Sequence, residues 1–270
     1  IHCRDLRDIE QCLDDYKKFG SNLPIILWLG NSQLHVINQH SPGEETASVI
    51  LHKLLKKKGY YLMTFSQPNA NIQEHLILAA HLYQKLPVSD LILPVVFDDM
   101  REIKIRPDIE KSFIDEDTKS LLVKSTKNGL NLYNDYLNKK DYSNSKNNKS
   151  VSLQENSEKL INDNLKKNWF LWSERSNLRG EFIFSLYNLR NFIFQINPSS
   201  IRKMIPGRYK KNFNALKDII EISKIRNINI FIYTVPIRND VKIPYRVDEY
   251  TNFKDELEQV SKKNNIKYRN

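Results

Sequence analysis

The feature that most constrains the fold of this chain is an alternation of short apolar runs and amphipathic segments. A continuous apolar run of about four to eight residues is typical of a parallel strand that is buried on both faces. Residues 24–29 are a run of this kind, further strands are predicted at 60–66, 90–97 and 227–236, and a fifth strand begins at 266–270. Amphipathic helices are predicted at 3–19, 43–59, 71–87, 209–227 and 246–265. This alternation predicts the α/β class, with a three-layer parallel sheet that has helices on both faces.

A long segment without a clear strand separates the third apolar run from the fourth. Within it, residues 138–159 are polar and of low complexity, which is typical of a mobile linker. Helical patterns flank this linker, notably at 115–137 and 165–197. The predicted organisation is a first part of the α/β core at 1–99, a helical insertion at 100–206 and a second part of the core at 207–270. Because the last strand has only begun at the final residue, we expect the core to be truncated there.

The net charge, the apolar runs and the cysteine spacing indicate which partners, membrane spans, disulfides and metal sites can be expected. The 42 basic and 32 acidic residues give a formal charge of +10, which favours contact with an anionic partner. No apolar run is long enough to span a bilayer. The two cysteines, Cys3 and Cys12, would lie on opposite faces of the predicted 3–19 helix, so no disulfide is expected within that helix. Their spacing also predicts no metal site.

Polar residues follow three of the predicted strands. They are Asn31 and Ser32 after the first strand, Asn69 and Asn71 after the second, and Asp98, Asp99 and Arg101 after the third. Parallel sheets bind ligands at the carboxyl ends of their strands, so we expect these three groups to converge on one cleft.

Ser32 has two possible roles. Gly30 would let the chain turn sharply off the strand, and a serine at the next helix N-terminus could act as a nucleophile beside free backbone N–H groups. Asparagine and serine are also favoured helix caps, so a capping role alone would explain the same residues.

The order of these motifs resembles that of the SGNH/GDSL hydrolases. "LWLGNSQLHV" resembles their first block, "GYYLMTFSQPNANIQEHL" the second, "DLILPVVFDDMRE" lies where the third would fall, and "IFIYTVPIRND" resembles the following strand and loop. The likeness covers roughly 24–99 and 225–270. It implies an SGNH-like version of the predicted α/β fold and acyl chemistry on a hydroxyl-rich substrate.

The resemblance also implies catalytic roles for three residues. Ser32 matches the nucleophile, Asn69 falls near the second-block oxyanion donor, and Asp98 falls where the third block has an asparagine. This last position departs from the family, because an ionised aspartate accepts hydrogen bonds and cannot donate one to an oxyanion. The neighbouring Asn31, Asn71, Asp99 and Arg101 are the candidate substrate-binding residues.

Within the superfamily, the chain is most similar to extracytoplasmic proteins of teichoic-acid D-alanylation and alginate acetylation. The resemblance therefore implies a serine acyl-ester hydrolase or O-acyltransferase that acts on a glycan or other polyol. It also implies an extracytoplasmic, membrane-associated location and a membrane-bound acyltransferase as a possible partner. Neither a metal nor an organic cofactor is expected.

The family's final Asp-x-x-His block, which supplies the general base, does not occur in these residues. We expect it beyond Asn270 if the protein is an enzyme. The alternative is a catalytically silent interaction module that docks a membrane-associated polysaccharide-modifying assembly. His35 and His75 are the local substitutes for the base, although each is also compatible with an ordinary helix position.

The segment 166–211 is basic and rich in aromatic residues. It could pack on the core with its arginines reaching solvent, dock on a membrane or protein, or bind nucleic acid. No nucleic-acid motif supports the last reading, so no nucleic-acid partner is expected. A flavodoxin-like domain that binds an anionic ligand is a further alternative, although the chain lacks a glycine-rich phosphate loop.

Overall fold

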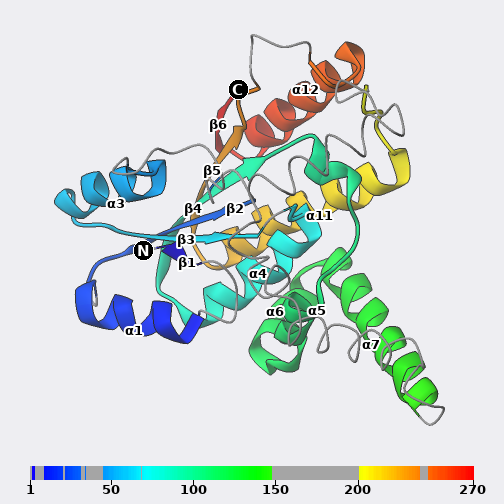
Figure 1. Ribbon diagram of the computed structural model, residues 1–270, viewed down its shortest axis with the longest axis horizontal. Helices are drawn as coiled ribbons and strands as arrows, with labels where there is room; N and C mark the ends of the chain where they lie inside the picture. The colour runs from blue at the N-terminus through cyan, green and yellow to red at the C-terminus, as the bar shows by residue number, and fades with distance from the viewer. Residues whose placement is uncertain are drawn as a thin grey trace, which may run out of the picture. The chain divides into compact units, whose positions relative to one another are not determined.

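The structure is a computed structural model of the 270-residue chain. It describes residues 2–3, 9–20, 22–31, 34, 45–67, 69–147, 201–237 and 243–270. The chain forms two compact units, one of residues 1–134 with 202–270 and the other of residues 135–201. The first unit contains the sheet and the candidate site (Figure 1).

The described strands form one six-stranded parallel sheet in the order β1-β3-β2-β4-β5-β6. The strands are β1 (His2–Cys3), β2 (Ile25–Gly30), β3 (Tyr61–Ser66), β4 (Val88–Val95), β5 (Asn229–Thr234) and β6 (Lys267–Arg269). The five predicted strands are all present, with bounds shifted by about two residues at most. The α/β class and the parallel sheet with helices on both faces are therefore confirmed.

One face of the sheet packs against the long helices of the core. These are α4 (Ile72–Lys85) and α11 (Pro206–Ile225), which lie side by side in Figure 1 and contact each other closely. Alternate strand residues such as Leu27, Leu29 and Leu93 point to this face and are fully buried. Their burial supplies most of the apolar driving force that positions the strand ends.

The other face of the sheet meets α3 (Ala47–Lys57). Ile26, Trp28 and Leu62 form a smaller apolar cluster here, against which Leu51 and Leu55 of the helix pack. The indole N–H of Trp28 donates to the hydroxyl of Tyr233, and the two atoms are 3.2 Å apart. This bond joins the second face across β4, from β2 to β5.

The chain after β4 is helical, as predicted, but the predicted 115–137 segment is two helices. The elements are η2 (Asp98–Arg101), α5 (Pro107–Glu110), η3 (Lys111–Ile114), α6 (Glu116–Ser125) and α7 (Lys127–Asn147). Thr126 separates the last two, because its extended backbone ends α6 and its hydroxyl accepts from the N–H of Gly129. The predicted insertion, 100–206, lies partly in each compact unit, and its residues 148–200 are outside the described part of the chain.

The N-terminal segment differs from the prediction. The helix α1 spans Ile9–Phe19, and His2–Cys3 is a short strand that pairs with β3. Cys12 on this helix is disulfide-bonded, and Cys3 is the only other cysteine of the chain. The prediction that both cysteines lie on one helix was therefore wrong, and the expectation of no disulfide within a helix did not foresee a bond from Cys12 to a residue outside α1.

The last helix, α12 (Val247–Lys263), leads into β6 as predicted. Its residue Phe253 is fully buried and packs edge-on against the ring of Phe97, just after β4. Among the described helices, none combines the length and apolarity needed to cross a bilayer.

Candidate functional site

The carboxyl ends of β2, β3 and β4 meet at one edge of the sheet, as the strand order requires. The N–H of Gln67, just after β3, donates to the carbonyl of Gly30 at the end of β2 over 3.0 Å. The amide of Asn31 reaches the carboxyl of Asp99 after β4. These two hydrogen bonds hold the three loops together at the edge where a parallel sheet presents its ligand site.

A cavity of about 540 Å³ opens at this edge. Among the described residues, its lining is Asn69, Asp98, Asp99, Arg101, Glu102, Lys104, Arg106 and Arg202. Four residues predicted from the strand ends are thus brought together: Asn69, Asp98, Asp99 and Arg101. Asn31 lies behind the lining, in contact with Asp99.

Asp99 is the buried carboxyl of the site. It is 5% exposed, and the Asn31 amide nitrogen lies 3.1 and 3.3 Å from its two oxygens. Burial raises the pKa of Asp99 well above its ordinary value, and the hydrogen bond from Asn31 offsets only part of this effect. Burial therefore disfavours the ionised form of Asp99 more than that of an exposed aspartate, so its carboxyl takes up a proton at a higher pH.

Asp98, in contrast, is the acceptor of an ionic cluster. Its carboxylate accepts from Arg101 over 3.3 Å, from the hydroxyl of Tyr245 over 2.9 Å and from Arg202. An aspartate held by two arginines and a tyrosine accepts hydrogen bonds and does not donate them. Asp98 lines the cavity, but its contacts there anchor Arg101 and Arg202.

The two asparagines after β3 have different environments. Asn69 adopts a left-handed backbone with φ of 55°, which asparagine tolerates better than most residues, and it lines the cavity. Asn71 caps α4: its side-chain oxygen accepts from the N–H of Glu74 in a capping box, and its amide donates to the carbonyl of Lys104. The capping role thus accounts for Asn71, which the cavity lining does not include.

Arg106 joins the second and third loops. Its guanidinium donates to the side-chain oxygen of Gln67 over 3.1 Å and lies 3.6 Å from the carboxyl of Glu74. The backbone N–H of Arg106 donates to the other oxygen of that carboxyl over 2.9 Å. Burial raises the pKa of Glu74, while the Arg106 charge favours its ionised form. These contacts fix the direction of the arginine at the cavity wall.

No family model, curated protein or solved structure matches this chain. The assignment of the site therefore depends on its own geometry. Ser32, the predicted nucleophile, and His35, a predicted substitute base, lie outside the described residues.

The described histidine side chains do not line this cavity. His75 is 1% exposed, neither ring nitrogen has a hydrogen-bond partner within the described structure, and burial lowers its pKa to about 4. His52 contacts the carbonyl of Leu62, and His81 contacts the hydroxyl of Thr118. His75, the second predicted substitute base, is therefore a buried neutral residue of α4.

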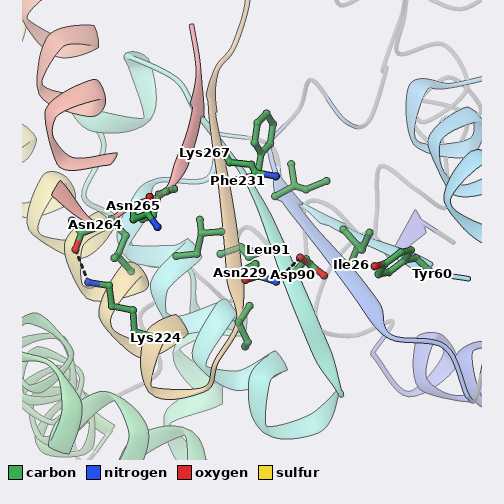
Figure 2. A pocket seen from close by; sticks show the side chains of 15 residues that line it. Ile26, Tyr60, Asp90, Leu91, Lys224, Asn229, Phe231, Asn264, Asn265 and Lys267 are labelled. Atoms are coloured by element: carbon green, nitrogen blue, oxygen red, sulfur yellow. Dashed lines mark hydrogen bonds between the residues drawn. The ribbon is translucent and has the colours of Figure 1, made fainter. Parts of the chain in front are cut away.

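A second cavity, of about 680 Å³, lies at the opposite ends of the strands (Figure 2). Asp90, Asn229 and Lys267 line it from the amino-terminal parts of β4, β5 and β6. The Asn229 amide donates to Asp90 over 3.0 Å, and Lys224 donates to Asn264 over 2.7 Å, as the dashed lines in Figure 2 show. Since this cavity contains none of the predicted site residues, the candidate site is the one at the carboxyl ends.

Sequence reasoning missed half of the cavity lining. Glu102, Lys104 and Arg106 belong to an irregular segment, and no pattern in it indicates which side chains face the cavity. Arg202 lies far along the chain, and a parallel bridge between Arg202 and Tyr245 brings it to the site. Only the general basicity of 166–211 indicated that cations of that region have a role.

Replacing Asp99 with asparagine is expected to remove part of the pH dependence of stability. Because the pKa of Asp99 is raised on folding, its protonated form stabilises the fold fully below its ordinary pKa of 3.8. That stabilisation is lost as the pH rises toward the folded-state pKa. Asp99→Asn, neutral at every pH, should therefore gain stability relative to the wild type as the pH rises.

The measurement is the free energy of unfolding in urea across a pH series for both proteins. Glu74, whose pKa is also raised by burial, is present in both, so the difference between the two curves isolates Asp99. A difference in unfolding free energy that stays constant from acidic to alkaline pH would contradict a raised pKa of the buried Asp99 carboxyl.

Proposed function

We propose that this protein is a serine acyl-ester hydrolase or O-acyltransferase that acts on a glycan or other polyol. The observation that supports the proposal is the convergence of three predicted loops at one edge of the sheet. Asn69, Asp98 and Asp99 line one cavity there, and Asn31 contacts Asp99. The nucleophile proposed for this site is Ser32, the residue that follows Asn31.

In the proposed reaction, the Ser32 hydroxyl attacks the acyl carbonyl and loses its proton to a general base. The Ser32 oxygen–carbon bond forms, and the bond to the departing alcohol then breaks as that alcohol takes up the proton. Backbone N–H groups and the amide of Asn69 are the proposed donors to the tetrahedral oxyanion. Water or a polyol hydroxyl then takes the acyl group from Ser32. The general base is not among the described residues that line the cavity.

The test is covalent labelling of the full-length protein with a fluorophosphonate probe. The wild type should be labelled, and Ser32→Ala should lose the label, whereas Ser66→Ala is the matched control. Ser66 ends β3 next to the site and is fully buried, so its loss should leave labelling intact. Equal labelling of wild type and Ser32→Ala, or none of either, would remove the enzyme proposal.

The second candidate function is a catalytically silent interaction module with the same fold. The observation that favours it is the ionic cluster of Asp98, which uses the third-block position to hold two arginines rather than to serve an oxyanion. Under this alternative no fluorophosphonate labelling occurs, and the protein instead docks a membrane-associated polysaccharide-modifying assembly. The labelling experiment therefore separates the two candidates.

A further inference from the structure

We propose that the cavity at the carboxyl ends binds an anionic group of the substrate, a carboxylate or a phosphate, through Lys104 and Arg106. This inference rests on the proposed function for its setting, because it names the class of glycan that the site would accept. The charged group would be recognised by the cavity wall.

The first argument is the charge of the lining. Four cations, Arg101, Lys104, Arg106 and Arg202, face three carboxyls, those of Asp98, Asp99 and Glu102. Asp99 is buried, the Asn31 amide donates to its carboxyl, and burial raises its pKa. The wall of the cavity is therefore positive, and a concave positive surface attracts anions.

The second argument is that the cations of the lining differ in their contacts within the protein. Arg101 and Arg202 both contact Asp98, and the Nε of Arg101 donates to the carbonyl of Lys203 over 2.9 Å. The single carboxylate of Asp98 thus balances part of their charge, and both side chains are held by contacts within the protein. Lys104 is exposed, and its ammonium group has no ion-pair partner in the described parts of the chain.

The third argument is the preorganisation of Arg106. Its side chain is 30% exposed, and its contacts with Gln67 and Glu74 hold it in one direction at the cavity wall. A fixed, planar guanidinium suits carboxylate and phosphate oxygens, because the cost of ordering the side chain has been met on folding. The carbonyl of Lys104 accepts from Asn71, which fixes the backbone of the second cation as well.

The other cavity offers a contrast that supports this choice. Two lysines line it, Lys224, which already donates to Asn264, and Lys267 of β6, and its carboxyl Asp90 accepts from Asn229. Most of the remaining lining there is apolar, with several isoleucines and Phe231. An anionic group would thus find better partners at the carboxyl ends of the strands.

The test is an NMR titration of the Ser32→Ala protein, which cannot turn over, with three sugars at low ionic strength. Glucose is the neutral reference, glucuronate carries a carboxylate, and glucose 6-phosphate carries a phosphate. At least one charged sugar should bind in a saturable and salt-sensitive manner, and glucose should not. The charged sugar that binds more tightly identifies the anionic group.

The variants make the test specific to the cavity wall. Lys104→Gln should weaken binding of the charged sugar about tenfold, as expected for the loss of one charge-assisted contact. Lys57→Gln is the matched control, because it removes the same charge from an exposed position at the end of α3. Arg106→Gln should also weaken binding, and its thermal unfolding is measured in parallel because Arg106 pairs with Glu74.

Three outcomes would overturn the inference: equal binding of glucose, no saturable binding of either charged sugar, or equal weakening by Lys57→Gln. The labelling of Ser32 is a separate measurement. A labelled serine without anion preference would keep the proposed function and reject this inference. Anion binding without a labelled serine would keep this inference, reject the proposed function and indicate a binding module.

Discussion

Replacing Asn212 with alanine is expected to lower the free energy of unfolding by about 3 kcal/mol. Asn212 lies on α11 and is fully buried. Its amide nitrogen is placed to donate to the carbonyls of Met100 and Glu102, at 3.2 and 2.6 Å, and its oxygen accepts from the N–H of Gln73 over 3.4 Å. Alanine would leave these backbone groups buried without a partner, and each such group is costly.

The same substitution should loosen the cavity wall, because Asn212 holds the backbone that leads from η2 to Lys104. Urea unfolding measures the stability, and hydrogen exchange of the Gln73 amide reports the local opening. The control is Asn214→Ala on the same helix, a partly exposed position where alanine favours the helix. A loss of stability equal to that of the control would show that the Asn212 contacts are not needed.

Replacing Cys12 with serine is expected to lower the free energy of unfolding by about 2–3 kcal/mol. Cys12 is disulfide-bonded, and Cys3 is the chain's only other cysteine, so an intrachain bond would close a loop of about ten residues. Such a closure restricts the unfolded chain and also holds the short β1 strand near α1. The measurement is thermal or urea unfolding of the wild type and the variant without reductant.

A reductant provides the matched control for the disulfide. It should lower the stability of the wild type to that of Cys12→Ser and should leave the variant unchanged. Free thiols in the unreduced wild type, counted with a thiol reagent on the unfolded protein, would contradict the bond. A stability loss on reduction of both proteins would show that the reductant acts elsewhere.

The sheet could be predicted from the sequence because its strands are buried on both faces. Residues 24–29 are apolar at every position and 60–66 are mostly so, and every residue of β2 and β3 is buried. The β1 strand could not be predicted, since two residues have no periodicity. The break at Thr126 was missed for a different reason: a threonine within a helical pattern does not reveal whether its hydroxyl bonds the following turn.

The site could be predicted only at the level of the loops. Strand ends in a parallel sheet converge, so Asn69, Asp98, Asp99 and Arg101 were brought to one cavity. Which of two adjacent aspartates is buried depends on the turn of η2, and the sequence does not specify it. The capping box of Asn71 and Glu74 does have a sequence signature, and it explains why Asn71 serves the helix instead.

The hydrogen bond between Arg101 and the carbonyl of Lys203 has a consequence for variation in length. About a hundred residues separate Arg101 from Lys203 in the chain, yet the two are in contact, and Asp98 holds Arg202 at the same place. The free energy of closing a connecting segment between fixed ends changes only logarithmically with the length of that segment. A change in length between residues 135 and 201, which form the second compact unit, should therefore leave the strand ends and the residues that line their cavity unchanged.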